Sequence, residues 1–183
     1  YVLTVGIRKE AIFAHTRYYR KQMKEGGRST RIAVISPAQN AYSESFIQAH
    51  KTGLEKVVAY YYGGHMPKFL EGHGPLRRSS LDVRIKRRFS FREWGTDADD
   101  LAHPLKEQQI DVVVAEYGPT GAQVAPVCNA LEIPLVIHCH GYDASKYAIL
   151  DKYKEAYQAA FDQASKIIVV SQAMYDMVLA IGA

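Results

Sequence analysis

The sequence contains few cysteines and no hydrophobic run long enough to cross a membrane. Its two cysteines, Cys128 and Cys139, both lie in apolar stretches. Two cysteines cannot form a disulfide scaffold, so we expect a reducing, cytoplasmic environment. The apolar run at residues 167–170 is typical of the chain, whereas a membrane span needs ~18–20 residues. No secretory signal pattern opens the sequence, and because residue 1 is not Met we expect the natural start to lie upstream.

Motifs of several common α/β enzymes are also missing. There is no Gly-x-x-x-x-Gly-Lys-Ser/Thr phosphate loop, and no Gly-x-Gly-x-x-Gly follows the first expected strand. There is no Gly-x-Ser-x-Gly nucleophile elbow. These absences argue against an NTPase and against a standard dinucleotide-dependent dehydrogenase.

The composition is that of one globular domain. Of the 183 residues 48% are hydrophobic and 23% are charged, which is too apolar for a disordered chain. The length suffices for one buried core but not for two full α/β domains.

Positive charge is concentrated in two blocks. Residues 8–28 carry seven basic and two acidic side chains, and residues 68–92 carry eight basic and two acidic ones, so the remainder is net acidic. Such blocks attract phosphates, anionic lipid or nucleic acid, or they are solvated faces. We expect no nucleic-acid partner.

Short apolar runs alternate with longer helical patterns from residue 31 onward. The expected strands are 31–35, 56–62, 111–115, 134–137 and 166–170, and the expected helices are 43–54, 96–109, 122–131, 144–165 and 171–181. This alternation predicts an α/β fold with a doubly wound, Rossmann-like parallel sheet over residues 31–183. Residues 1–30 form a separate segment, either a helical extension packed on the sheet or the tail of an upstream domain.

Polar and glycine residues follow every expected strand. In open α/β sheets ligands bind at the carboxyl ends of the strands, so these positions predict a small-molecule site. The segments concerned are residues 36–44, 63–65, 116–121 and 138–143, together with Ser171.

The segment His-Cys-His-Gly-Tyr-Asp at residues 138–143 is the most distinctive. A metal site would need ligands beyond His138 and His140, and no histidine follows His140, so we expect no metal. Alternation places both histidines on one face, with Cys139 opposite. They are interpreted as ligand-facing imidazoles beside a close backbone approach at Gly141, or as buried structural histidines.

Two of these segments resemble the amino-terminal half of glycosyltransferase family 4. They are Ala-Glu-Tyr-Gly-Pro-Thr-Gly at residues 115–121 and Ile-Pro-Leu-Val-Ile-His-Cys-His-Gly-Tyr-Asp-Ala-Ser at residues 133–145. Weaker matches at residues 43–47 and 168–183 extend the resemblance over residues 31–183.

The resemblance implies a GT-B enzyme, in which two Rossmann-like domains face a cleft. The amino-terminal domain recognises the acceptor, and a donor-binding domain with a Glu-x7-Glu motif would follow Ala183. The reaction would retain the anomeric configuration without a metal. No cofactor is expected, because the nucleotide sugar is a substrate. The first loop lacks the Gly-Gly pair of many members.

By the same resemblance, His140 is the cleft histidine and the expected catalytic residue. The other residues expected to contact acceptor or line the cleft are Glu44, Glu116, Tyr117, Gly118, Thr120, Gly121, His138, Gly141, Asp143, Ser145 and Ser171.

The sequence therefore predicts the acceptor-binding domain of a retaining glycosyltransferase of polysaccharide biosynthesis, acting on a glycan or lipid-linked acceptor and inactive as a fragment. The alternative is a non-catalytic Rossmann-like module that binds a sugar or nucleotide. In the basic block at residues 68–92, Leu81, Ile85 and Phe89 would form one helix face edged by arginines. Such a helix binds anionic membrane, packs on the domain, or binds an anionic glycan.

Overall fold

A single mixed sheet forms the centre of the protein in this computed structural model, which describes residues 3–5, 29–39, 45–54, 56–76, 96–141 and 147–183. The strand order is β1-β8-β7-β6-β2-β3-β4-β5. The five central strands are mutually parallel, which confirms the predicted doubly wound fold. They are β8 (Lys166–Val169), β7 (Leu135–His138), β6 (Val112–Glu116), β2 (Ile32–Ile35) and β3 (Val57–Tyr62).

Short antiparallel strands extend both edges of the sheet. β1 (Leu3–Val5) pairs with β8, and β4 (Phe69–Leu70) with β5 (Gly74–Pro75) continues from β3. Residues 3–5, assigned from sequence to a separate segment, therefore belong to the domain's own sheet. Runs of two or three residues carry too little periodicity to predict. Residues 6–28 of the expected amino-terminal segment and the expected helix that contains Leu81, Ile85 and Phe89 lie outside the described residues.

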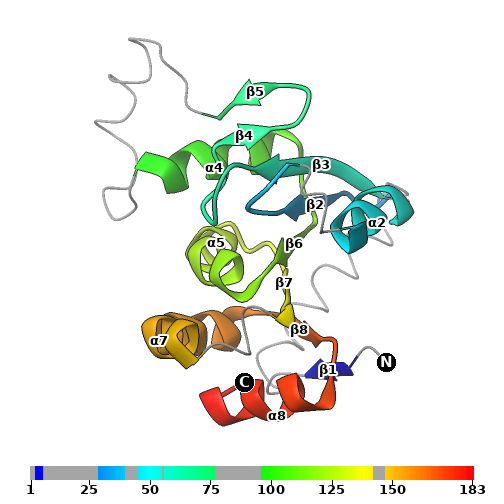
Figure 1. Cartoon of the computed structure of the whole chain (residues 1–183). Helices are drawn as coiled ribbons and strands as arrows, with labels where there is room; N and C mark the ends of the chain where they lie inside the picture. Colours follow the sequence, from blue (N-terminus) through cyan, green and yellow to red (C-terminus); the bar gives the residue numbers. More distant parts are fainter. Residues whose placement is uncertain (1–2, 6–28, 40–44, 55, 77–95, 142–146) are drawn as a thin grey trace.

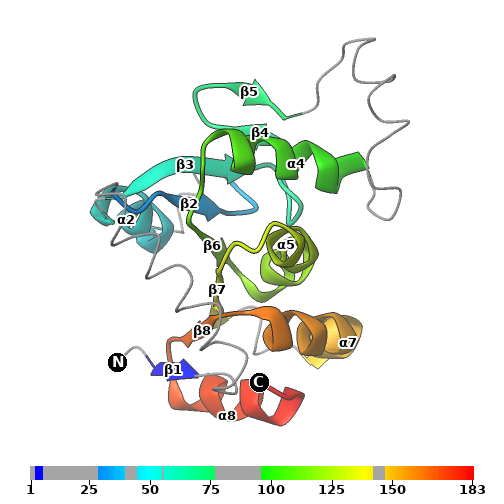
Figure 2. The same ribbon diagram turned by 180° about the vertical axis from the view of Figure 1, so that it is seen from behind.

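Helices cover the two faces of the sheet unequally. α4 (Thr96–Glu107), α5 (Gly118–Ala130) and α7 (Tyr147–Gln163) pack on one face, and α2 (Ser45–Gly53) lies on the other (Figures 1 and 2). α8 (Gln172–Ile181) lies beside β1 and β8. The larger core cluster joins Ile35, Ala115 and Ile137 to the first face, while Val34 and Tyr60 pack with Ile47 of α2.

α5 begins four residues before its expected start at residue 122. Gly-Pro-Thr-Gly at residues 118–121 has the composition of a loop, but proline suits the first helical turn, where its missing N–H costs nothing. The glycines permit close packing: a Cβ at Gly118 would lie 2.8 Å from Tyr157 Oη, and one at Gly121 would lie 2.7 Å from Ile137 Cδ1. Both glycines therefore bring α5 close to its neighbours.

We expect Gly121→Ala to lower the free energy of unfolding by about 1–3 kcal/mol, because the methyl group overpacks a well-filled core. Three carbons of the fully buried Ile137 side chain lie within 2.8 Å of the added Cβ. Gly53→Ala is the matched control, since its Cβ at the end of α2 would meet none of the described residues within 4 Å. Urea titrations should show an unchanged or slightly more stable control. Equal effects of the two substitutions would contradict this packing role.

Candidate active site

The carboxyl ends of the central strands bring polar side chains together at the point where the strand order reverses. The chain passes from β2 to β3 on one side and later returns to β6 on the other side of β2. Glu116 is the last residue of β6, and His138 is the last residue of the adjacent β7. This is the location where open α/β sheets bind ligands.

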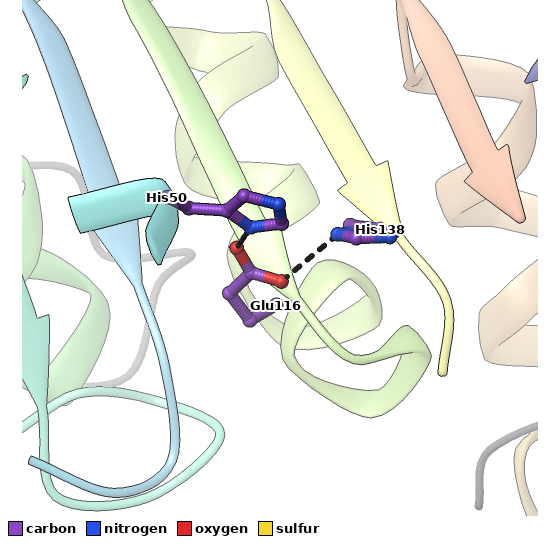
Figure 3. Close-up of side chains that lie close together, drawn as sticks. All are labelled: His50, Glu116 and His138. Carbon is purple, nitrogen blue, oxygen red and sulfur yellow. Dashed lines mark hydrogen bonds and ion pairs between the residues drawn. The ribbon is translucent and has the colours of Figure 1, made fainter. Parts of the chain in front are cut away.

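A buried carboxylate forms the centre of the site. Glu116 Oε1 lies 2.7 Å from His50 Nδ1, and Glu116 Oε2 lies 2.9 Å from His140 Nε2 and 3.2 Å from His138 Nδ1. Figure 3 shows the carboxylate between His50 and His138. Glu116 is completely buried, whereas about a third of the His50 side chain is exposed. We call these four residues the Glu116–histidine cluster.

Strand alternation accounts for three members of the cluster. Glu116 and His138 are paired across β6 and β7, and the residues before them, Ala115 and Ile137, pack into the core on the opposite face. His138 and His140 both reach the same carboxylate oxygen, which confirms that they share a face. Cys139 lies between them in the sequence and is buried in the opposite core, as predicted.

α2 contributes the member that the sequence analysis missed. Phe46 and His50 are four residues apart and project from the same side of this helix. The Phe46 ring lies 4.3 Å from the His140 ring, and Ile47 anchors the helix in the core. His50 precedes His138 by almost 90 residues, so no local pattern in the sequence connects the two. The sequence feature that could have indicated His50 is its place beside the apolar face of the helix that follows β2.

The histidines keep Glu116 ionised despite its burial. Burial by itself would raise the pKa of this carboxyl group. The hydrogen bonds from His138, His140 and His50, together with the charge of His138, outweigh burial and lower the pKa of Glu116 from 4.5 to about 2. The site therefore holds a negative charge at neutral pH within a ring of N–H donors.

Tyr117 connects the cluster to α5 through a strained backbone. Its φ of 76° and ψ of 142° are rare for any residue with a side chain and cost about 1–3 kcal/mol. The Tyr117 N–H donates to the His138 carbonyl at 2.9 Å, and its ring lies 4.6 Å from the His140 ring. Tyr117 is half-buried. Tyr117 and Phe46 thus both flank the His140 imidazole.

The remaining sequence-predicted site residues have different positions. Thr120 is buried, and its Oγ1 lies 3.1 Å from His65 Nδ1 in the loop after β3. Gly118 and Gly121 are buried packing positions of α5. Ser171 caps α8 by accepting a hydrogen bond from the Met174 N–H, which is a structural role.

A Cβ at Gly141 would meet none of the described residues within 4 Å, so the expected close approach of a ligand to its backbone stays a prediction. Glu44, Asp143 and Ser145 lie outside the described residues.

Three groups of the cluster also have the composition of a metal site. One ligand atom from each of His50, Glu116 and His138 lies within 4.8 Å of the others. The expectation of no metal depended on the absence of a histidine after His140, and His50 shows that this reasoning was incomplete. The hydrogen bonds to Glu116 nevertheless account for the geometry without a cation, and metal independence stays a prediction.

Comparison with protein families matches residues 55–183 to Glycosyltransferase Family 4. The chain belongs to glycosyltransferase family 4. The resemblance inferred from residues 115–121 and 133–145 is thereby confirmed. No curated protein and no solved structure matches the chain significantly. The Rossmann-like sheet is the fold expected for the amino-terminal domain of this family and is consistent with a GT-B arrangement.

In this glycosyltransferase family 4 chain, the matched region contains Glu116, His138 and His140, whereas His50 precedes it. Among the described residues, no helix combines the length and the apolar character that a bilayer span requires.

Proposed function

We propose that this chain is the acceptor-binding domain of a retaining, sugar-nucleotide-dependent glycosyltransferase, whose donor-binding domain lies outside the chain. Family membership supports a glycosyltransferase module. The observation that carries the proposal is the Glu116–histidine cluster at the carboxyl ends of β6 and β7. We further propose a cytoplasmic enzyme of polysaccharide biosynthesis with a glycan or lipid-linked acceptor.

The proposed chemistry requires a positioned acceptor hydroxyl and stabilisation of a departing nucleoside diphosphate. His140 is the proposed catalytic residue, because its imidazole is oriented by a carboxylate and flanked by two aromatic rings. Tyr117 would line the cleft beside it. Thr120, which contacts His65, would support the loop after β3.

Turnover by the full-length protein tests this function. Purified protein is incubated with a panel of nucleotide sugars and candidate acceptors, with and without EDTA, and diphosphate release and product anomers are followed by NMR. We expect transfer with retained configuration, unaffected by EDTA, and no transfer by residues 1–183 alone. Folded full-length protein that binds sugar or nucleotide but transfers nothing would identify a non-catalytic binding module. Efficient transfer by residues 1–183 alone would contradict the proposed division into two domains.

The basic block at residues 68–92 gives a separate prediction about membrane binding. Lys68 and Phe69 at its start are exposed and β4 and β5 follow, whereas the helical pattern of Leu81, Ile85 and Phe89 lies outside the described residues. We expect the full-length protein to sediment with anionic phosphatidylserine vesicles at low salt, because each basic residue near such a surface contributes on the order of 1 kcal/mol.

Charge reversal of Arg84, Arg87 and Arg88 should abolish this sedimentation, and neutral vesicles are the control. If charge reversal left the sedimentation unchanged, or if the wild-type protein did not sediment with anionic vesicles, the block would not be a membrane-binding helix.

A further inference from the structure

Three aromatic side chains lie in a row on the sheet face that α2 covers, where β3 pairs with β4. The rings of Tyr62 and Phe69 are stacked, with centroids 5.4 Å apart and planes inclined by 19°, and Tyr62 stacks in turn on Tyr60 at 6.3 Å. Tyr60 is buried, whereas 37% of Phe69 is exposed. We call these three residues the aromatic row, and Phe69 is its exposed end.

Two charged side chains border the aromatic row. The Lys51 Nζ atom on α2 lies 4.7 Å from the centre of the Tyr60 ring and 2.6 Å from Glu71 Oε1. The Glu71 N–H donates to the Tyr60 carbonyl, so Glu71 continues the pairing of β4 with β3 and lies on the same face as Phe69. Both charged side chains are partly exposed. An exposed aromatic ring therefore lies near one strong donor and one strong acceptor of hydrogen bonds.

This combination suits a carbohydrate. The face of an aromatic ring carries partial negative charge and attracts the C–H groups of a sugar ring. The hydroxyl groups of the same sugar can donate to the Glu71 carboxylate and accept from the Lys51 ammonium group. A lipid tail or an apolar protein surface would instead desolvate this ion pair without offering it hydrogen bonds, which costs free energy.

The aromatic row shares a sheet face with the Glu116–histidine cluster. Phe69 is paired with Tyr62, and the registers of β3, β2 and β6 continue this line through Ser36 to Glu116 (Figure 1). Three strand spacings of ~4.8 Å separate Phe69 from Glu116, which gives about 14 Å along the sheet. A short oligosaccharide spans this distance, whereas a monosaccharide does not.

We infer that the aromatic row is a subsite for an oligosaccharide acceptor. A sugar several units from the reacting hydroxyl group stacks on Phe69, and Lys51 and Glu71 hydrogen-bond its hydroxyls. This inference rests on the proposed function in placing the reacting end of the acceptor at the Glu116–histidine cluster. The binding of a sugar by Phe69 does not itself depend on catalysis.

Saturation-transfer difference NMR with the full-length protein measures this binding. The probes are three neutral tetrasaccharides, maltotetraose, cellotetraose and mannotetraose, and we expect at least one of them to bind. Phe69→Ala should weaken its binding about 10-fold, the scale for loss of an aromatic anchor. Phe69→Leu keeps an apolar side chain without a ring and should bind as weakly, whereas Phe69→Tyr should retain binding. Leu179→Ala on α8, where 43% of the leucine is exposed, is the control.

Four results would overturn the inference. They are unchanged binding in Phe69→Ala, an equal loss in Leu179→Ala, wild-type binding in Phe69→Leu, and no binding of any of the three tetrasaccharides. If Phe69→Ala lost only the sedimentation with anionic vesicles and kept tetrasaccharide binding, Phe69 would be a membrane contact instead.

Kinetics separate a failure of the subsite from a failure of the proposed function. For the tetrasaccharide that binds, Phe69→Ala should raise the acceptor KM about 10-fold and change kcat little, because the stacked sugar is remote from the reaction. A protein that binds the tetrasaccharide through Phe69 but transfers no sugar refutes the proposed function and leaves the subsite intact. Transfer with the same acceptor KM in the wild type and in Phe69→Ala refutes the subsite and leaves the proposed function intact.

Discussion

His140→Ala in the full-length protein is expected to lower kcat by about 100- to 10,000-fold, the range for loss of a group that transfers a proton in the transition state. The imidazole is buried between Phe46 and Tyr117 and is hydrogen-bonded to Glu116, so its removal leaves a gap at the expected reaction centre. Water filling this gap would not restore an oriented ring nitrogen. The measurement is initial-rate turnover of the nucleotide sugar at saturating acceptor.

His140→Gln separates chemistry from packing in this experiment. The amide nitrogen of glutamine can donate to Glu116 Oε2 as Nε2 of the histidine does at 2.9 Å, but an amide cannot take up and release a proton near neutral pH as an imidazole does. We therefore expect His140→Gln to be nearly as stable as the wild type and almost as inactive as His140→Ala. His103→Gln makes the same chemical change on α4 and should retain full turnover. Unchanged turnover in His140→Ala would remove this residue from the mechanism.

Glu116→Gln is expected to destabilise the protein by about 3 kcal/mol at pH 7, with a loss that shrinks in acid. The pKa of Glu116 is about 2 in the folded protein, against 4.5 for the ordinary carboxyl group. At ~1.4 kcal/mol for each tenfold difference in proton affinity, this gap corresponds to about 3 kcal/mol.

The direction of this pH dependence follows because the pKa of Glu116 is lower in the folded state than in the unfolded state. The ionised carboxylate stabilises the fold fully above the unfolded pKa of 4.5, and this contribution is lost as the pH falls toward 2. Urea unfolding of both proteins from pH 7 downward should therefore show their stability difference decreasing below about pH 4.5.

Glu71→Gln is the matched control for this comparison, because the Glu71 side chain is about one third exposed in its pair with Lys51. Such a surface pair contributes ~0–1 kcal/mol. If the difference in unfolding free energy between the wild type and Glu116→Gln stayed constant as the pH falls, this would contradict an ionised Glu116 with a lowered pKa.

Much of the architecture follows from the pattern of apolar residues. The five parallel strands all fall within a residue or two of their expected positions, because doubly covered strands consist of apolar runs and helices alternate with them. The first turn of α5 was missed, since Gly118 and Pro119 have loop composition, and the close packing of Gly118 against Tyr157 of α7 is a tertiary contact that the local sequence does not show. Strands β1, β4 and β5 were missed because two or three residues contain no measurable period.

Part of the candidate site could likewise be predicted from the sequence. Strand ends in an open α/β sheet predicted Glu116, Tyr117, His138 and His140 as site residues, since each lies within three residues of the end of an apolar run. The sequence by itself therefore determined the family, the fold class and three of the four residues in the cluster.

Only the tertiary structure decided how these residues meet. The strand order places β6 between β2 and β7, so α2, which follows β2, can bring His50 to a carboxylate 66 residues further along the chain. Local periodicity contains no information about contacts across such a separation. The charge state of Glu116 is likewise a tertiary property, because it depends on three imidazoles converging on one buried side chain, with burial alone acting in the opposite direction.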